Sequence, residues 1–138
     1  MTTIANPSQE DIAQILKDAK NIAVVGLSDN PDRTSNEVSS VMQSAGYKII
    51  PVNPKADEVL GEKAVPSLQD VDEPIDIINV FRRSEFIPDI ARDATNTDAK
   101  VFWTQLGIVN EEGYEIARNS GKTVIMDRCI KVEHSKMQ

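Results

Sequence analysis

The stretch Asn21–Ser35, NIAVVGLSDNPDRTS, constrains the fold of this chain more than any other. It begins with a short apolar run, Ile22 to Val25, which is rich enough in β-branched residues to predict a buried parallel strand. Gly26 ends the run, and a helical pattern begins near Thr34. A strand, a glycine loop and a helix N-terminus together form an anion site, because free backbone N–H groups and the helix dipole converge there. The stretch therefore predicts a site for a pyrophosphate.

Length and composition predict one ordinary domain, residues 1–138. With 138 residues, 40% of them hydrophobic and 27% charged, the chain can bury a core without disulfides or metal. No apolar run approaches the roughly 20 residues that a membrane span needs. The N-terminus MTTIANPSQEDI lacks the basic and apolar regions of a signal peptide, and the single cysteine, Cys129, leaves no intrachain disulfide. We therefore expect a cytoplasmic protein, and a net charge of −7 argues against a nucleic-acid partner.

Strand-like and helix-like patterns alternate along the whole chain. Apolar runs predict strands over residues 22–25, 47–52, 75–81, 100–103 and 123–126, with a short strand near 64–65. This alternation predicts an α/β fold, a Rossmann-like, doubly wound, mainly parallel sheet with helices on both faces.

Helix signals lie between these runs. Ser8, Ser84 and Asn110 are expected N-cap residues, and a short helix is expected from Ser67. After the last strand we expect Asp127 to Cys129 to be followed by a polar tail. Two helices should each place one row of side chains inward: Val38, Val41, Met42 and Ala45 on the first, and Phe86, Ile87, Ile90, Ala91 and Ala94 on the second.

Basic and polar residues follow the predicted strands. In an open α/β sheet, ligands bind beyond the carboxyl ends of the strands, so these residues should meet at one edge. Five of the 15 basic residues fall there, which favours an anionic ligand held by a local concentration of positive charge in an acidic protein. The residues expected at this edge are Ser28, Asn30, Arg33, Asn53, Lys55, Arg82, Arg83, Thr104, Gln105 and Arg128.

Two sequence features distinguish among nucleotide ligands. The loop has Gly26 alone where the dinucleotide fingerprint needs G-x-G-x-x-G, and the second strand ends in Asn53-Pro54-Lys55 where NAD needs an acidic residue. A lysine there suits a phosphate on the ribose. NADP and coenzyme A, both of which carry such a phosphate, remain open on these grounds.

Five motifs resemble the family of small bacterial CoA-binding proteins. They are AVVGLSDNPDRTSNEV, IIPVNPK, DIINVFRR, VFWTQLGI and VIMDRCIKVEH, in the family's order from Asn21 to His134. Proteins of that family look like a free-standing version of the N-terminal CoA-binding domain of the succinyl-CoA synthetase α subunit. The resemblance implies a Rossmann-like domain that binds coenzyme A or an acyl-CoA.

The resemblance also implies a set of site residues. Around the pyrophosphate it places Gly26, Leu27, Ser28, Asp29 and Asn30, with Arg33 and Ser35 nearby. The segment Val52, Asn53, Pro54 and Lys55 would bring Lys55 to the phosphate of the adenosine. Val80, Phe81 and Arg82 would border the nucleotide, and Trp103, Thr104 and Gln105 would line the CoA site, although Trp103 ends a strand that favours core packing.

We expect binding without catalysis. The phosphorylated histidine of the synthetase belongs to a second domain, and the only histidine here, His134, lies after the last predicted strand, so ligase activity is not carried over. Cys129 and His134 are too few for a zinc site, and no G-x-S-x-G motif is present. An NADP-dependent oxidoreductase and a CoA-responsive regulatory or interaction module are the alternatives; an exposed apolar patch would favour the module.

Cys129 has two interpretations. As a small apolar residue at a strand end, it would be structural. Beside Arg128, however, its thiol pKa would be lowered, and the thiolate could form a mixed disulfide with the thiol of coenzyme A.

Overall fold

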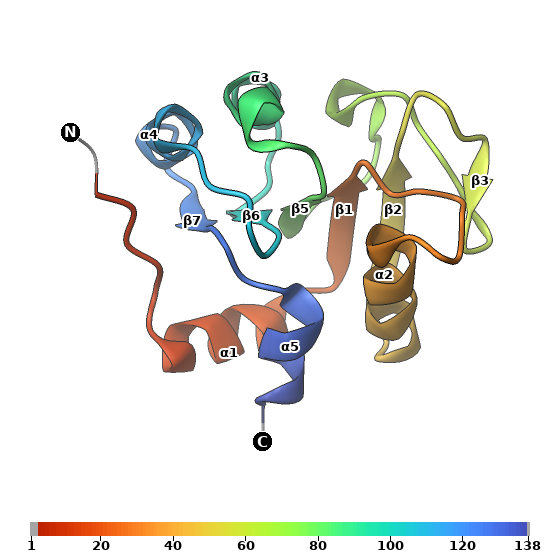
Figure 1. Cartoon of the computed structure of the whole chain (residues 1–138), viewed down its shortest axis with the longest axis horizontal. Coiled ribbons are helices and arrows are strands. Elements are labelled where there is room, and N and C mark those ends of the chain that lie inside the picture. Colours follow the sequence, from red (N-terminus) through yellow and green to blue (C-terminus); the bar gives the residue numbers. More distant parts are fainter. Residues whose placement is uncertain (1–2, 138) are drawn as a thin grey trace.

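Five parallel strands form the central sheet of the computed structural model, which describes residues 3–137 (Figure 1). Their order is β2-β1-β5-β6-β7, and every neighbouring pair is parallel. The predicted parallel sheet is confirmed, with strand ends within about two residues of those expected. The strands are β1 (Asn21–Val25), β2 (Lys48–Val52), β5 (Ile77–Val80), β6 (Val101–Thr104) and β7 (Thr123–Ile125).

Both faces of the sheet are covered by helices (Figure 1). On one face lie α1 (Gln9–Asp18), α2 (Thr34–Ser44) and α5 (Ile130–Ser135), and on the other lie α3 (Ile87–Ala94) and α4 (Glu111–Asn119). Successive strand residues point to opposite faces, so Ile22 and Val24 of β1 pack toward α1 and α2 while Ala23 and Val25 pack toward α3 and α4. This double burial explains why the strands read as unbroken apolar runs.

The segment between β2 and β5 contains only short elements. A two-stranded hairpin, β3 (Glu58–Val59) and β4 (Glu62–Lys63), precedes the expected strand near residue 64, which is reduced to a single parallel bridge between Val52 and Val65. The helix expected from Ser67 is a short 3₁₀ turn, η1 (Leu68–Asp70), with Ser67 as its N-cap.

Two of the three expected N-caps are confirmed and one is wrong. Ser8 Oγ accepts a hydrogen bond from the Asp11 N–H, and Asn110 Oδ1 accepts one from the Gly113 N–H. Ser84 instead opens a 3₁₀ turn, η2 (Ser84–Phe86), ahead of α3, and its Oγ accepts from the Val109 N–H. The side chain therefore joins two loops at the edge of the sheet instead of capping a helix.

Three side chains expected to face inward are exposed: Val41, Ala45 and Phe86. Val41 and Phe86 each keep 39% of their surface accessible. The residues beside them on the same predicted faces, Val38 and Ile87, are buried as expected. Each helix buries a narrower stripe than its pattern suggested.

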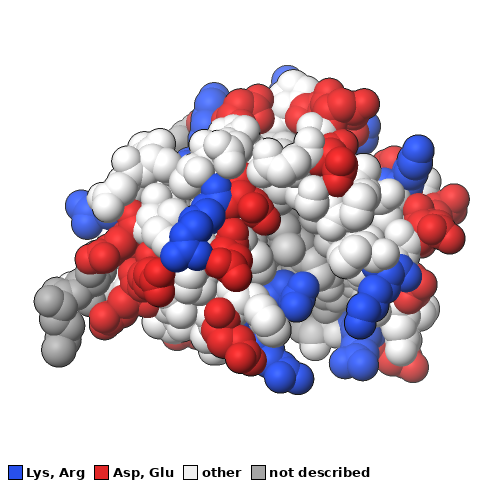
Figure 2. Space-filling view, turned by 90° about the horizontal axis from the view of Figure 1, so that it is seen from above, with Lys and Arg blue, Asp and Glu red and all other residues white. Residues whose placement is uncertain are grey.

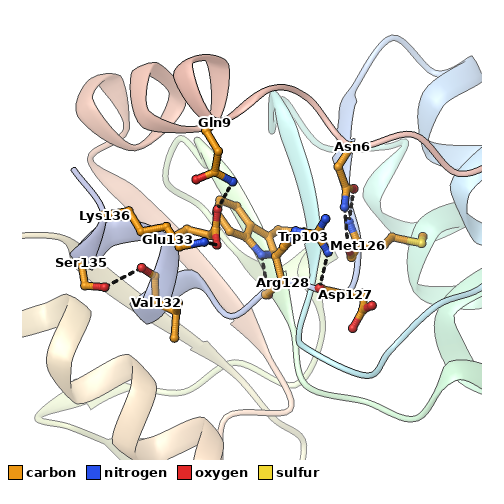
Figure 3. Close-up of polar contacts among 10 residues, drawn as sticks. All are labelled: Asn6, Gln9, Trp103, Met126, Asp127, Arg128, Val132, Glu133, Ser135 and Lys136. Atoms are coloured by element: carbon orange, nitrogen blue, oxygen red, sulfur yellow. Dashed lines mark hydrogen bonds and ion pairs between the residues drawn. The ribbon is translucent and has the colours of Figure 1, made fainter. Parts of the chain in front are cut away.

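The expected polar tail is wrong, because residues after Cys129 form α5. Ile130 is 1% exposed and Glu133 4% exposed, and both lie against the body of the protein. Glu133 accepts a hydrogen bond from Gln9 Nε2 at 2.9 Å and pairs with Lys136 Nζ at 3.0 Å (Figure 3). The hydrogen bond from Gln9 of α1 and the burial of Ile130 thus both hold α5 in place.

The N-terminal segment is tied to the end of β7 (Figure 3). Asn6 donates to the Met126 carbonyl and accepts from the Met126 N–H, both at 2.8 Å. Trp103, at 0% exposure, donates its indole N–H to the Arg128 carbonyl at 2.9 Å, so the core packing predicted for this ring is confirmed. These contacts fix the chain that leaves β6 and β7 at the carboxyl edge of the sheet.

Candidate functional site

The strand order places a topological switch point between β1 and β5. From β1 the chain crosses through α2 to β2 on one side, whereas β5 pairs on the other side of β1 and leads through α3 to β6. The loops that follow β1 and β5 therefore diverge and leave a crevice at their carboxyl ends. In open α/β sheets this is where ligands bind.

Gly26 follows β1 at the floor of this crevice. Its φ is +86°, in the left-handed region that favours glycine, and its N–H donates to the Val52 carbonyl at 2.9 Å. A Cβ at this position would lie 2.8 Å from the Phe81 carbonyl oxygen and 2.9 Å from Arg82 Cδ. The close approach that excludes a side chain is thus to the neighbouring loop of the protein itself.

Side chains of the chain itself fix the loop after Gly26. The Ser28 N–H donates to Ser35 Oγ at 3.0 Å, and the Ser28 carbonyl accepts from Asn36 Nδ2 at 2.9 Å. Asn53 Nδ2 donates to the Leu27 carbonyl at 2.8 Å, which joins this loop to the end of β2. The loop is therefore preorganised without a ligand.

The N-terminus of α2 opens beside this loop. Arg33 is the N-cap residue and makes no side-chain capping bond. Within residues 3–137, the backbone N–H groups of Thr34 and Ser35 have no hydrogen-bond acceptor. These two donors and the positive end of the helix dipole are the ordinary elements of an anion site.

Three adjoining hollows follow this edge, and together we call them the edge groove. The loop hollow, about 340 Å³, is lined by Gly26, Ser28, Arg33, Thr34, Ser35 and Phe81. The β2 hollow, about 170 Å³, includes Val52, Asn53, Pro54, Pro66, Ser67 and Arg82. The β6 hollow, about 440 Å³, includes Arg82, Arg83, Ser84, Gln105, Gly107 and Ile108. Gly26 lines the first two, Thr34 and Phe81 the first and third, and Arg82 the last two, so the groove is continuous.

Positive charge gathers around the groove. Figure 2 looks down on this edge and shows Lys and Arg side chains beside a hollowed middle, with Asp and Glu side chains interspersed among them. Arg33, Lys55 and Arg82 are exposed, and none of them forms an ion pair within residues 3–137. Arg83 lies 3.8 Å from Glu85, and the Arg82 guanidinium lies 4.6 Å from the centre of the Phe86 ring. Two unpaired arginines thus line the groove itself.

Arg128, the fifth expected basic residue, contributes less. It is half-buried, donates to the Asp127 carbonyl at 2.8 Å and lines none of the three hollows.

At the opposite edge of the sheet, a hollow of about 440 Å³ has the reverse character. It is lined by Asp72, Glu73 and Asp98 among others. An anion would be repelled there, so the charges of this hollow disfavour it as an anion site.

The expected site residues divide into two groups. Gly26, Ser28, Arg33, Ser35, Val52, Asn53, Pro54, Phe81, Arg82 and Gln105 line the groove. The others do not: Leu27, Val80, Trp103 and Thr104 are at 0% exposure and support the groove from beneath, while Asp29, Asn30 and Lys55 are exposed beside it. Any ligand contact from the four buried residues would have to come from their backbones.

Gln105 has an unusual environment within the groove. The residue is 8% exposed, and its Oε1 has no hydrogen-bond partner within the described part of the chain. A buried acceptor without a partner costs about 1–3 kcal/mol. A ligand that donates a hydrogen bond would recover this free energy.

Several groove residues were missed by the sequence analysis. Thr34 could have been included as the first residue of the helix that opens onto the loop. Pro66 and Ser67 reach the groove only because the bridge between Val52 and Val65 folds their segment across β2, and nothing local in the sequence signals that contact.

Cys129 precedes α5 as its N-cap residue and is half-buried. It lines none of the three hollows. The mixed disulfide with coenzyme A therefore stays a prediction.

Residues 3–137 contain no group of three or more His, Cys, Asp or Glu residues placed to hold a metal ion. Over the same residues, no helix combines the length and apolar character needed to cross a membrane.

Comparisons with known proteins identify a family and relatives of similar length. Residues 20–135 match the sequence model of a family described as "CoA binding domain". The chain is 62% identical over 130 residues to the "Uncharacterized protein YneT" of Bacillus subtilis, covering 94% of this chain and 96% of that protein. A solved structure, the "hypothetical protein from Pyrococcus horikoshii OT3", superimposes with a TM-score of 0.92 at 34% identity and covers 99% of both chains.

A larger protein shares the same region. The "Acetate--CoA ligase [ADP-forming] II subunit alpha" of Pyrococcus furiosus is 26% identical over 124 residues. The match covers 82% of this chain but only 27% of that protein. The similarity is thus to one part of a longer ligase subunit.

Proposed function

The chain belongs to the family of CoA binding domains, and we propose that it binds coenzyme A, free or as a thioester, in the edge groove. The observation that carries this proposal is the loop hollow at the switch point. There the unpaired N–H groups of Thr34 and Ser35 open beside Arg33 in a loop that is already ordered. Such an arrangement suits a pyrophosphate, whose two negative charges need donors and cations that require no rearrangement.

The two ends of coenzyme A extend in opposite directions from its pyrophosphate, and the groove offers a hollow for each. We assign the adenosine to the β2 hollow, beside which Lys55 is exposed and unpaired. Lys55 then contacts the 3′-phosphate of the ribose. Arg82, which lines both outer hollows, lies where the pyrophosphate passes between them.

The long arm of coenzyme A occupies the β6 hollow in this arrangement. The arm contains two amide groups, each with a donor N–H. Gln105 supplies the acceptor that lacks a partner in the protein. The pairing would satisfy the buried carboxamide and position the arm against Ile108.

We assign no catalytic group to this site. His134, the only histidine, lies on α5 with its ring edge-on to Tyr47 at 5.7 Å, and it lines none of the three hollows. Besides donors, cations and apolar surface, the lining of the groove includes one carboxylate, that of Asp93 in the β2 hollow, and we assign it no catalytic role.

Titration calorimetry with three ligands tests the proposal. Coenzyme A should bind one to one, and dephospho-CoA should bind about ten- to a hundredfold more weakly, because one charge-assisted contact is lost. NADP should bind more weakly than coenzyme A. Tight binding of NADP together with no binding of coenzyme A would overturn the proposal in favour of an oxidoreductase.

Two variants locate the phosphate contact. Lys55→Met should reduce the affinity for coenzyme A to that for dephospho-CoA, without changing the latter. Lys17→Met removes an equally exposed lysine from α1 and should change neither affinity. Equal affinities of the unmodified protein for coenzyme A and dephospho-CoA would rule out the assignment of Lys55.

A further inference from the structure

Three exposed apolar side chains belong to the two segments whose other residues line the β6 hollow, and we call them the apolar lip: Phe86, Leu106 and Val109. Their exposures are 39%, 64% and 43%, and they make up three of the five large hydrophobic side chains exposed within residues 3–137. Phe86 belongs to the same loop as Arg83 and Ser84, and Leu106 and Val109 flank Gly107 and Ile108, all of which line the hollow. The lip therefore belongs to the two segments that form this end of the edge groove.

The loop that carries Leu106 is held rigidly. The Gly107 N–H donates to Asp127 Oδ1 at 2.6 Å, and the Ile108 carbonyl accepts from Thr104 Oγ1 at 2.7 Å. The Val109 N–H donates to Ser84 Oγ at 3.2 Å and joins the two loops of the lip. The ordered loop thus holds the Leu106 side chain exposed to solvent. Exposed apolar surface of this kind, at the end of a groove, is typical of a contact site.

Gln105 indicates what that contact site receives. Gln105, whose Oε1 has no partner within the described residues, lines the β6 hollow and directly precedes Leu106 in the chain. In coenzyme A, the outer amide of the arm is separated from the sulfur by only two methylene groups. If this amide pairs with Gln105, whatever is attached to the sulfur lies within one side-chain length of Gln105, where the apolar lip is.

We propose that the apolar lip receives the acyl group of a short, uncharged acyl-CoA, so that the site prefers a thioester to free coenzyme A. This inference rests on the proposed binding of coenzyme A. A small ligand is favoured over a protein partner because the lip adjoins a buried acceptor without a partner, which only a group that enters the hollow can satisfy.

The apolar character of the lip favours an uncharged acyl group over an acidic one. This preference comes from the lip and not from the charges of the hollow, which Arg82 and Arg83 line. A carboxylate placed against Phe86, Leu106 and Val109 would lose hydration that these exposed apolar side chains cannot replace.

Four ligands test the inference: coenzyme A, acetyl-CoA, butyryl-CoA and succinyl-CoA. Each fully buried methylene group raises affinity about fourfold, so a butyryl chain partly covered by the lip should bind about tenfold more tightly than free coenzyme A. Acetyl-CoA should lie between them. Succinyl-CoA, which has the same number of acyl carbons as butyryl-CoA, should bind no better than coenzyme A.

Two variants assign the preference to the lip. Leu106→Asn should reduce the ratio of butyryl-CoA to coenzyme A affinity to about one. Val132→Asn, an exposed valine on α5 that lines none of the hollows, should leave the ratio at about ten. An unchanged ratio in Leu106→Asn would overturn the inference and leave the lip as a surface for a protein partner.

The outcomes separate this inference from the proposed function. If coenzyme A fails to bind, the proposed function itself is wrong. If coenzyme A binds but butyryl-CoA binds no better, or succinyl-CoA binds best, only the inference about the acyl group is overturned.

Discussion

Gly26 shows how one residue serves both the fold and the site. Its positive φ turns the chain sharply at the end of β1, and the absence of a Cβ lets the loop after β5 approach to within van der Waals contact. Both features bring Arg82 and the N-terminus of α2 to the same crevice. A substitution here should therefore affect binding through the shape of the groove.

The variant Gly26→Ala tests this role, with Gly46→Ala as its matched control. Both glycines have positive φ, so each alanine should lower the free energy of unfolding by about 1–2 kcal/mol. Only Gly26→Ala must also displace Phe81 and Arg82, because a Cβ at Gly46 has nothing within 4 Å. We expect Gly26→Ala alone to lose at least tenfold in coenzyme A affinity, measured by calorimetry beside urea unfolding. Normal affinity in a folded Gly26→Ala would show that the ligand lies elsewhere.

At the scale of elements, α3 and α4 pack unusually closely at one point. A Cβ on Gly113, in the first turn of α4, would lie 2.5 Å from Ile87 Cγ2, at the start of α3. Glycine ordinarily weakens a helix, by about 1 kcal/mol relative to alanine. Here glycine fits because Ile87 of α3 occupies the space that a side chain at position 113 would need.

Gly113→Ala should therefore destabilise the protein, against the usual effect of this change in a helix. Overpacking should lower the free energy of unfolding by about 1–3 kcal/mol. Combining it with Ile87→Leu, which removes the γ2 methyl group, should recover part of that loss in a double-mutant cycle. A stabilised Gly113→Ala would contradict the close packing of α3 against α4.

Tyr47 connects α1 to the start of β2. Its hydroxyl donates to the Leu16 carbonyl, and burial raises the pKa of the phenol above its ordinary value of 10.0. The folded protein therefore keeps this proton at a pH where the unfolded chain has lost it. The resulting contribution to stability is present below pH 10.0 and is lost as the pH rises through the folded pKa.

Tyr47→Phe should lower the free energy of unfolding by about 1 kcal/mol at neutral pH, because one buried hydrogen bond is lost. Above the ordinary pKa of tyrosine, its stability should fall less steeply with pH than that of the unmodified protein. Tyr114→Phe is the control at neutral pH, since its hydroxyl contact to the Ala5 carbonyl is long, at 3.5 Å. Parallel stability–pH curves for Tyr47→Phe and the unmodified protein would contradict the role of the buried phenol.

The elements that the sequence predicted well are those with strong local signals. Apolar runs buried on both faces located the five strands of the central sheet, and Ser8 and Asn110 marked two helix starts. The failures depend on distant contacts. Ser84 bonds to Val109 instead of capping a helix, and α5 is held by Gln9 and by one buried isoleucine, so its six residues show no clear period.

The same distinction applies to the site. Residues that directly follow strands, such as Ser28, Asn53 and Arg82, could be predicted because parallel strands end at one edge. Sequence position could not show that Thr104 and Trp103 would be buried beneath the groove while Gln105, the next residue, would line it with an unpaired oxygen. How deeply a residue at the end of a strand is buried depends on how the neighbouring loops pack over it.

At the scale of the whole molecule, the proposed function requires an acidic protein to attract an anion. The net charge is −7, yet Arg33 and Arg82 line one groove without ion pairs and Lys55 lies beside it. For the proposed coenzyme A site, we therefore expect the distribution of charge, and not its sum, to decide the affinity for the ligand. Local attraction acts over a few ångströms, whereas repulsion by the remaining acidic surface acts over longer distances and is screened first.

Salt should therefore affect coenzyme A binding in two stages. At about 0.01 M ionic strength the Debye length is about 30 Å, and repulsion between the net negative charge and the anionic ligand should lower the affinity. Raising the ionic strength to about 0.1 M shortens the Debye length to about 10 Å, which should screen that repulsion while the contacts to Arg33, Arg82 and Lys55 persist. Toward about 1 M these contacts are screened as well, and affinity should fall.

A series of calorimetric titrations should thus show maximal affinity at intermediate salt, whereas Lys55→Met should lose less affinity at high salt. A steady decline from the lowest salt would show instead that the cations of the groove dominate at every distance.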